Sequence, residues 1–448
     1  MAGIKDVVKD FYTVDDALGF DEQTTKDMQH RHLNKTRTIL GDCKFFVKAD
    51  GARLTDGSGN THYDFIGAVG VCSVGNNNPF IWEQLEKVYK AKQQMIGVVA
   101  YHSLASAFAH DMAVLSPGGQ LTKMGTATGG AEAIEAAIKL VKLASRKKEG
   151  KTRILSCVNA FHGKTTGAVS VGGKEFWRMY QHPLMEMVDW VPFGDAAALE
   201  EALKKGEYMA FFVEPIQGEG GIVVPPAGYL TKVRELCDKY GAIMVADEIQ
   251  CGCGRSGKLW VCDYEGVIPD VLVYAKGFSG GMIPAGGYIC KEDVYEAAYG
   301  SEETCWQHTA TYQENSLGAA AGLATLQYLY ENKLIEAAAE KGEYFMGKLR
   351  EVQGRYPGII KEVRGMGLMI GLETCEVPDR FKEGYSDYFA DPINNELIDT
   401  FRVQVMHTIN NPAVFRFLPP LTVSLEDIGY VLKSFEQCVK EAYERVNA

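Results

Sequence analysis

Four short, almost wholly apolar runs, separated by helix-like segments, constrain most strongly how this chain can fold. The runs are residues 154–158, 210–213, 242–246 and 271–275. Such strands are typical of a parallel sheet that is buried on both faces. The segment 230–240 and others between the runs have helical patterns, which implies right-handed βαβ crossovers. The pattern therefore predicts an α/β fold with a mostly parallel sheet flanked by helices.

The length of the chain favours two domains. At 448 residues the chain exceeds the usual size of one domain, and 46% hydrophobic residues are enough for a large core. We expect a large domain over residues 66–335. Residues 1–65 and 336–448 are expected to form a smaller α+β domain. Within the first segment, two short runs around a turn at residues 45–56 predict an antiparallel hairpin.

Charge and cysteine content exclude several classes of protein. A net charge of −12 argues against binding to nucleic acid and against docking on an acidic membrane. No uncharged apolar stretch reaches the ~18 residues that a membrane span needs. The 11 cysteines show no repeated Cys-x-x-Cys spacing, and no signal peptide is visible, so we expect reduced thiols and a cytoplasmic location. The nine histidines lack metal-ligand spacing, and no metal is expected.

An Asp and a Lys stand at the ends of two of the predicted strands. Asp247 closes the third run, and Lys276 follows the fourth directly. Ligands of open α/β sheets bind just beyond the carboxyl ends of parallel strands. A carboxylate and an amine in that place suit pyridoxal phosphate (PLP), which needs a protonated ring nitrogen and a Schiff-base lysine. The alternative for Asp247 is a strand-end cap, whereas a lysine between an apolar strand and a Gly-rich turn is harder to explain structurally.

A Gly-rich segment at residues 125–131 leads into a predicted helix. Small residues let the backbone approach an anion, and the free N–H groups at a helix N-terminus can hold a phosphate. An ordinary Gly-rich turn remains an alternative.

Two other segments fail as nucleotide sites. Residues 252–257 fit G-x-G-x-x-G, but no clear helix follows them, and Gly163-Lys164-Thr165 lacks the first glycine of a P-loop.

Three further places carry side chains that suit such a site. Phe161 follows the first strand and could stack on a flat cofactor ring, although it could equally belong to the core. Glu214 and Glu219 lie in one Gly-rich loop after the second strand. Arg416 stands between two phenylalanines in an apolar strand and needs an anionic partner, either a substrate carboxylate or Glu219.

Together these segments resemble the class III, fold-type I, PLP-dependent aminotransferases. The resemblance runs from about residue 41 to the last helix. It is carried by residues 160–164, 214–221, 247–250, 254–257, 275–277, 308–312, 364–367 and 416–421, which in combination and order are highly specific for the class.

The resemblance implies a role for each matched residue. Lys276 would bind PLP covalently and move the proton, while Asp247 would pair with the pyridinium nitrogen. Gln250 would lie near the 3-oxygen of the ring and Phe161 on its face. Glu219 and Arg416 resemble a switch pair that admits an amine first and a 2-oxo acid second. The remaining cofactor-binding residues that we expect are Gly129, Gly130, Ala131, His162, Glu214 and Thr311, with the backbone N–H groups of Gly130 and Ala131 on the phosphate.

The resemblance also bears on partners and substrates. Thr311 would reach the phosphate of a neighbouring subunit, so we expect a homodimer or a dimer of dimers. Residues 225–230, 409–411 and 419–422 resemble putrescine (diamine) aminotransferases. The expected reaction is ping-pong transfer from a diamine or ω-amino compound, putrescine- or cadaverine-like, to a 2-oxo acid. We expect 2-oxoglutarate as the acceptor, and pyruvate stays open as the alternative.

Several substrates and two other activities stay open. Ornithine, acetylornithine, taurine and 4-aminobutyrate are alternative amines, and a PLP-dependent racemase, epimerase or aminomutase could use the same Lys276 and Asp247. A non-enzymatic PLP-fold binding protein is a further alternative. The chain departs from the class pattern at residues 129–131, which lack hydroxyls, at Cys251 and Cys253, and at residues 96–102 and 313–316. These departures weaken the assignment of the substrate more than the assignment of the enzyme class.

Overall fold

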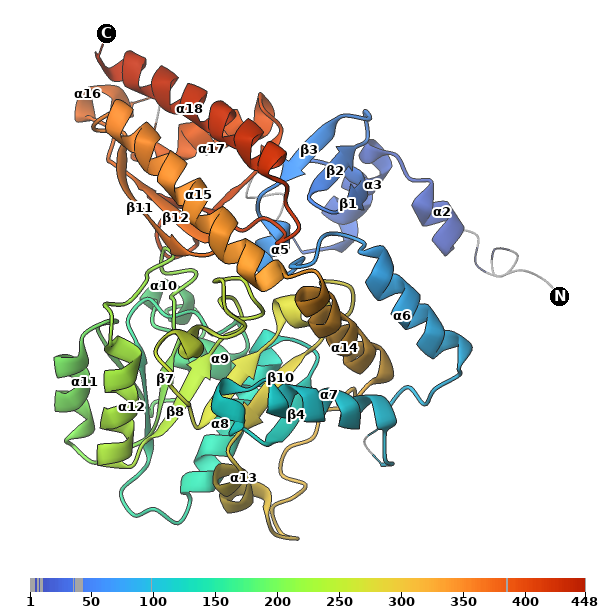
Figure 1. Ribbon diagram of the computed structural model, residues 1–448, viewed down its shortest axis with the longest axis vertical. Helices are drawn as coiled ribbons and strands as arrows, with labels where there is room; N and C mark the ends of the chain where they lie inside the picture. The colour runs from blue at the N-terminus through green and yellow to red at the C-terminus, as the bar shows by residue number, and fades with distance from the viewer. Residues whose placement is uncertain are drawn as a thin grey trace. The chain divides into compact units, whose positions relative to one another are not determined.

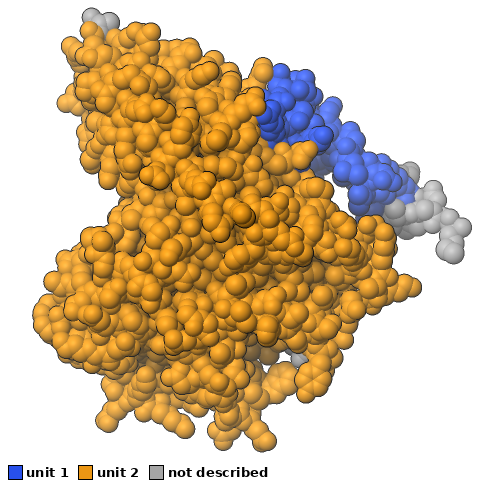
Figure 2. Space-filling model, in the orientation of Figure 1, with its two compact units in different colours: residues 1–49, 53–62 blue, residues 50–52, 63–448 orange. Residues whose placement is uncertain are grey.

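The computed structural model describes residues 5, 8, 11–34, 36, 43–97, 99–383 and 386–447 (Figure 1). Residue 41, where the resemblance begins, and Val98 of the segment 96–102 lie outside the described residues. The chain divides into two compact units, coloured separately in Figure 2. One comprises residues 1–49 and 53–62, and the other residues 50–52 and 63–448.

The described residues of the first unit include two short helices and most of the predicted hairpin, whose residues 50–52 belong to the second unit. Its helices are α2 (Val14–Leu18) and α3 (Glu22–His32), and its strands are β1 (Phe46–Asp50) and β2 (Arg53–Asp56), which are neighbours in a sheet. The side chain of Thr13 caps α2 and that of Asp21 caps α3, so each helix begins where a polar residue accepts a free N–H. The division into domains at residues 66 and 336 stays a prediction.

A seven-stranded sheet forms the centre of the second unit. Its order is β4-β10-β9-β8-β7-β5-β6, and β10 alone runs antiparallel to its neighbours. The strands are β4 (Lys123–Ala127), β5 (Arg153–Cys157), β6 (Val188–Val191), β7 (Tyr208–Val213), β8 (Ile243–Asp247), β9 (Val271–Tyr274) and β10 (Gly286–Cys290). The prediction of a mostly parallel sheet is confirmed. The apolar-run pattern missed β4 and β10, which contain glycines, and β6, which carries an Asp.

Both faces of this sheet are covered, as the apolar runs require. In β7, Ala210 and Phe212 pack with helix α8 (Gly130–Ser145), whereas Phe211 and Val213 pack with helix α12 (Tyr229–Tyr240) on the other face. A strand between two helical layers has no water-facing side, so every residue of β7 is buried.

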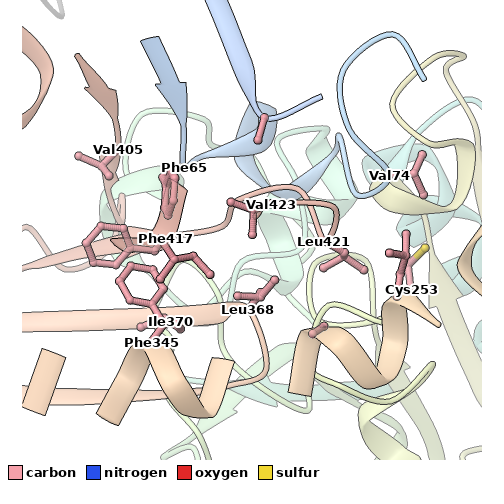
Figure 3. Packing of buried hydrophobic residues seen from close by; sticks show 14 of the residues in the cluster. Phe65, Val74, Cys253, Phe345, Leu368, Ile370, Val405, Phe417, Leu421 and Val423 are labelled. Carbon is pink, nitrogen blue, oxygen red and sulfur yellow. The ribbon is translucent and has the colours of Figure 1, made fainter. Parts of the chain in front are cut away.

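A second, antiparallel sheet lies in the C-terminal part of the chain. Its order is β11 (Ile360–Met366), β12 (Met369–Thr374), β15 (Val414–Phe417) and β14 (Met406–His407), and helix α15 (Leu334–Arg355) packs on it. Figure 3 shows Phe345, Ile370 and Phe417 in its core. The same apolar cluster continues to Leu421 and Cys253. This core therefore ties the second sheet to the loops that follow β8.

The remaining elements include two strands, β3 (Thr61–Asp64) and β13 (Val403–Gln404), of the sheet that contains β1 and β2. The others are α5 (Gly67–Gly70), α6 (Pro79–Lys90), α7 (Ser103–Val114), α9 (Thr166–Val171), α10 (Glu175–Arg178), α11 (Ala196–Leu203), α13 (Glu292–Tyr299), α14 (Ser316–Glu331), α16 (Asp379–Lys382), α17 (Ala390–Asp399), α18 (Leu425–Asn447) and the 3-10 helices η1 (Pro117–Gly119), η2 (Val261–Tyr264) and η3 (Lys276–Ser279). Among the described residues, no helix combines the length and apolar character that crossing a membrane requires.

Candidate active site

The carboxyl ends of the parallel strands meet at one edge of the large sheet and enclose a cavity. Asp247 ends β8 opposite Val273 of β9, so Lys276 emerges beside it. The cavity has a volume of about 180 Å³. It is lined by Gly130, Ala131, Phe161, His162, Gly163, Glu214, Glu219, Asp247, Ile249, Gln250 and Lys276.

Most of the predicted site residues thus come together, and three do not line the cavity. Gly129 is the N-cap of α8, directly before the lining residue Gly130. Arg416 is joined to the cavity through its contact with Glu219. Thr311 is exposed and does not line the cavity of its own chain. Its role in a neighbouring subunit stays a prediction.

Asp247 is held in place by a histidine. The Nδ1 atom of His162 lies 2.7 Å from Oδ2 of Asp247, and the backbone N–H of Ile249 donates to Oδ1 at 3.1 Å. Asp247 is only 3% exposed. Burial is the largest single influence and opposes protonation of His162, but the hydrogen bond to Asp247 and the charges of Asp247 and Glu214 together outweigh it and raise the pKa of the imidazole. Sequence reasoning placed His162 near the cofactor but missed this pairing.

Lys276 has a strained backbone and a depressed pKa. Its φ angle is +48°, in the left-handed region that residues other than glycine rarely adopt. Burial lowers the pKa of its amine, and the charge of Glu219 opposes this effect without cancelling it. A neutral amine is the form that can act as a nucleophile or accept a proton. Backbone strain at such a residue is typical of a functional site.

Glu219 and Arg416 form a buried ion pair at the side of the cavity. Their Oε1 and Nη1 atoms are 2.5 Å apart, and the two residues are only 4% and 1% exposed. Burial alone would raise the pKa of Glu219, but the charge and hydrogen bond of Arg416 hold it below its usual value. Gln250 donates to the same carboxylate from 3.3 Å. Within the described chain the Nε atom of Arg416 has no hydrogen-bond partner, so this guanidinium retains capacity for another anion.

Glu214 organises the backbone around the cavity. Its carboxylate accepts the N–H of Phe161 at 2.9 Å and that of Gly218 at 3.1 Å, and so links the loops that follow β5 and β7. Burial raises the pKa of Glu214 to about 7, although the charge of His162 opposes the shift. Phe161 is thereby fixed at the cavity wall.

The start of α8 is shaped for an anion. Glu132 accepts both the N–H and the hydroxyl of Thr128 at 2.6 Å, which closes the turn before the helix and leaves the following N–H groups for a ligand. A Cβ on Gly129 would meet no atom within 4 Å, so there is open space beside the cap. A Cβ on Gly163 would lie 2.7 Å from Cβ of Ala131, and only glycine allows this close approach.

These residues fit PLP. A phosphate suits the backbone N–H groups at the start of α8, and Asp247 is a buried carboxylate that can pair with a pyridinium nitrogen. Phe161 borders the same cavity as Lys276, whose depressed pKa suits covalent attachment. The hydroxyls missing from residues 129–131 leave the amide donors intact. Within the described chain, no group of three His, Cys, Asp or Glu side chains could hold a metal ion.

Comparison with known proteins assigns the chain to a family. A family model described as aminotransferase class-III matches residues 39–439. An uncharacterized aminotransferase of Schizosaccharomyces pombe is 52% identical over 425 residues, which cover 95% of this chain and 88% of that protein. The chain therefore belongs to the class III aminotransferases. It is an enzyme that transfers amino groups with PLP as its cofactor.

Solved structures agree with this assignment. An ornithine aminotransferase of Toxoplasma gondii, described with PLP at its active site, is 26% identical with a TM-score of 0.85 and covers 98% of this chain and 100% of its own. An acetylornithine aminotransferase of Elizabethkingia anophelis is 28% identical with a TM-score of 0.79, covering 94% of this chain and 99% of its own. The fold predicted from the sequence is therefore confirmed.

Proposed function

We propose that this aminotransferase moves the terminal amino group of a diamine or ω-amino compound to a 2-oxo acid, with a putrescine- or cadaverine-like amine as donor and 2-oxoglutarate as acceptor. The observation that carries the proposal is the buried pair of Glu219 and Arg416. An enzyme that alternates between an amine without a carboxylate and an acid with one needs an arginine that can be neutralised in the first case and freed in the second.

The pair meets this need through charge balance. While an amine occupies the cavity, Glu219 satisfies Arg416 and no unpaired buried cation remains. When a 2-oxo acid enters, its carboxylate takes the place of Glu219 on the guanidinium, which has an unused Nε donor. Glu219 keeps the N–H of Ile409 at 3.2 Å as an alternative partner.

The other residues divide the chemistry among them. PLP, when bound, supplies an electron sink for the electrons released from the substrate carbon. Lys276 accepts the proton of that carbon at Nζ and later returns it, which its depressed pKa permits. Asp247 holds a proton on the ring nitrogen, and His162 keeps the Asp247 carboxylate in place. We assign Gln250 to the 3-oxygen of the ring, Phe161 to its face, and Gly130 and Ala131 to the phosphate.

Thr311 is assigned to a second copy of the chain. Its exposure supports a homodimer or a dimer of dimers in which it reaches the phosphate of the neighbouring site.

All 11 cysteines are free, which supports a reducing, cytoplasmic location.

A panel of amines tests the proposed donor. Putrescine, cadaverine, ornithine, acetylornithine, taurine and 4-aminobutyrate would each be offered with 2-oxoglutarate and with pyruvate, and release of glutamate or alanine would be measured. We expect putrescine or cadaverine with 2-oxoglutarate to give the highest kcat/KM. Greater turnover of ornithine or acetylornithine, the substrates named for the solved relatives, would contradict the diamine. Turnover of an amino acid without any 2-oxo acid would favour a racemase or aminomutase.

A further inference from the structure

The loop that carries Ile409 and Asn410 holds Glu219 by both its side chain and its backbone. The N–H of Ile409 donates to Oε2 of Glu219 at 3.2 Å, and the N–H of Asn410 donates to its backbone carbonyl at 3.1 Å. Two consecutive peptide groups therefore determine where the Glu219 carboxylate stands relative to Arg416.

Asn410 is itself fixed from three directions. Its Oδ1 accepts the indole N–H of Trp177 at 2.8 Å, and its Nδ2 donates to the carbonyl of Asn159 at 2.9 Å. The ammonium of Lys174 donates to its backbone carbonyl at 3.0 Å. Asn410 is only 5% exposed, and its backbone N–H, backbone carbonyl, side-chain oxygen and side-chain nitrogen all have partners. A fully bonded buried asparagine fixes the loop in one position.

The side-chain partners of Asn410 belong to the segment of chain that follows β5, not to the strand that carries Arg416. Trp177 belongs to α10 and is half-buried, with the ammonium of Lys164 4.2 Å from its ring centroid. None of Trp177, Lys174 and Asn410 lines the cavity. They therefore act on the reaction indirectly, and the bonds of Asn410 connect them to Glu219.

We infer that Asn410 and Trp177 are positioning residues that set how readily Glu219 releases Arg416, and thereby set the balance between amine and 2-oxo acid. This inference rests on the proposed function. A firmly held Glu219 favours the paired state, which suits the amine. When Glu219 is held less firmly, Arg416 is more available to the carboxylate of a 2-oxo acid. The charge of Arg416 is then less well neutralised while an amine is bound. The two substrates should respond in opposite directions, which a general loss of stability would not produce.

The test compares Trp177→Phe and Asn410→Ala with wild type as PLP-loaded enzymes. Trp177→Phe removes the indole N–H donor together with part of the ring, and the loss of one hydrogen bond corresponds to a change of about threefold to tenfold in an equilibrium constant. We expect KM for the amine to rise and KM for the 2-oxo acid to fall, so that their ratio changes by about this factor. Asn410→Ala removes two side-chain bonds and should change the ratio further. Trp177→Phe keeps the inference testable if Asn410→Ala does not fold.

Trp82→Phe provides a matched control. The indole N–H of Trp82 donates to the side-chain oxygen of Asn77 at 3.3 Å, which is the same kind of bond, and helix α6 contributes no residue to the cavity. The ratio should be unchanged in this variant. A readout independent of turnover is the Kd of glutarate, a dicarboxylate without the reactive carbonyl, measured by titration calorimetry. It should fall in Trp177→Phe and Asn410→Ala, because Arg416 is released more easily.

The outcomes separate the inference from the proposed function. An unchanged KM ratio in folded Asn410→Ala, or parallel changes for both substrates, would overturn the inference while the function stands. If wild type transfers no amino group from any amine of the panel to a 2-oxo acid, the proposed function is wrong. In that case a glutarate Kd that is the same in wild type and both variants overturns the inference as well.

Discussion

Two of the buried carboxylates that line the cavity, Asp247 and Glu219, differ in the partner that each has. Asp247 pairs with His162, and both residues follow strands of one sheet. Glu219 pairs with Arg416, which belongs to a strand of the other sheet. In the proposed function the first pair has nothing to release, because His162 orients Asp247 toward a cofactor that stays bound. The second pair opens once in every proposed catalytic cycle. The proposal thus assigns the cofactor to one sheet and the selection of the substrate to a contact with the other sheet.

The largest effect is expected from Lys276→Ala, because Lys276 serves both halves of the reaction. Loss of a positioned proton-transfer group costs about 100- to 10,000-fold in rate, and loss of the covalent PLP attachment adds to this. Turnover with every amine and every 2-oxo acid should fall by at least about 1,000-fold. Borohydride treatment should no longer fix PLP to the chain, as mass spectrometry would show. Normal turnover in this variant would refute the mechanism.

Asp247→Asn tests the cofactor side of the comparison. Asn keeps a similar shape but loses the charge that retains a proton on the ring nitrogen. A hydrogen bond to a charged group is worth up to about 3 kcal/mol, so kcat should fall by roughly 100-fold. The decrease should be similar in the half-reactions with amine and with 2-oxo acid, measured separately by stopped-flow absorbance. A loss confined to one half-reaction would break the comparison.

Arg416→Ala tests the substrate side. KM for 2-oxoglutarate should rise by about 10- to 150-fold, because a charge-assisted contact worth about 1.5–3 kcal/mol is lost. KM for the amine should change far less, since the amine has no carboxylate for Arg416. Steady-state kinetics with each substrate varied in turn would measure both values. Equal increases would show that Arg416 does not discriminate between the substrates.

The smallest effect concerns Glu214, which lies beside the Asp247 pair. Its pKa is raised to about 7 by burial, so the folded state favours the protonated form. The stability that this proton provides is present below about pH 4.5 and is lost as the pH rises to about 7. The difference in free energy of unfolding between wild type and Glu214→Gln should therefore decrease as the pH rises from about 4.5 to about 7. Urea titrations at several pH values would measure it, and a difference that is constant with pH would contradict the shift.

Local sequence patterns predicted the cofactor side of the site better than the substrate side. Asp247 and Lys276 could be found because each directly follows an apolar strand, and parallel strands end at one edge. The bond between His162 and Asp247 was not predictable in this way, since β7 lies between their strands and the contact depends on register. Asn410 was noted only as part of the resemblance over residues 409–411, and its contacts were not predictable, because it lies in an irregular loop whose position is decided by distant side chains such as Trp177. The antiparallel β10 was missed because its Gly-rich start weakens the apolar pattern.

The position of β10 in the sheet also affects how the site can form during synthesis. Strand β4, which leads into the start of α8, has β10 as its neighbour in the sheet. The ribosome makes β5, β6, β7, β8 and β9 before it makes β10, so these five strands can assemble while β4 has no strand to pair with. Helix α8 itself contacts β7 and β9. A nascent chain that ends before residue 286 therefore already has partners for this helix but none for the strand that precedes it.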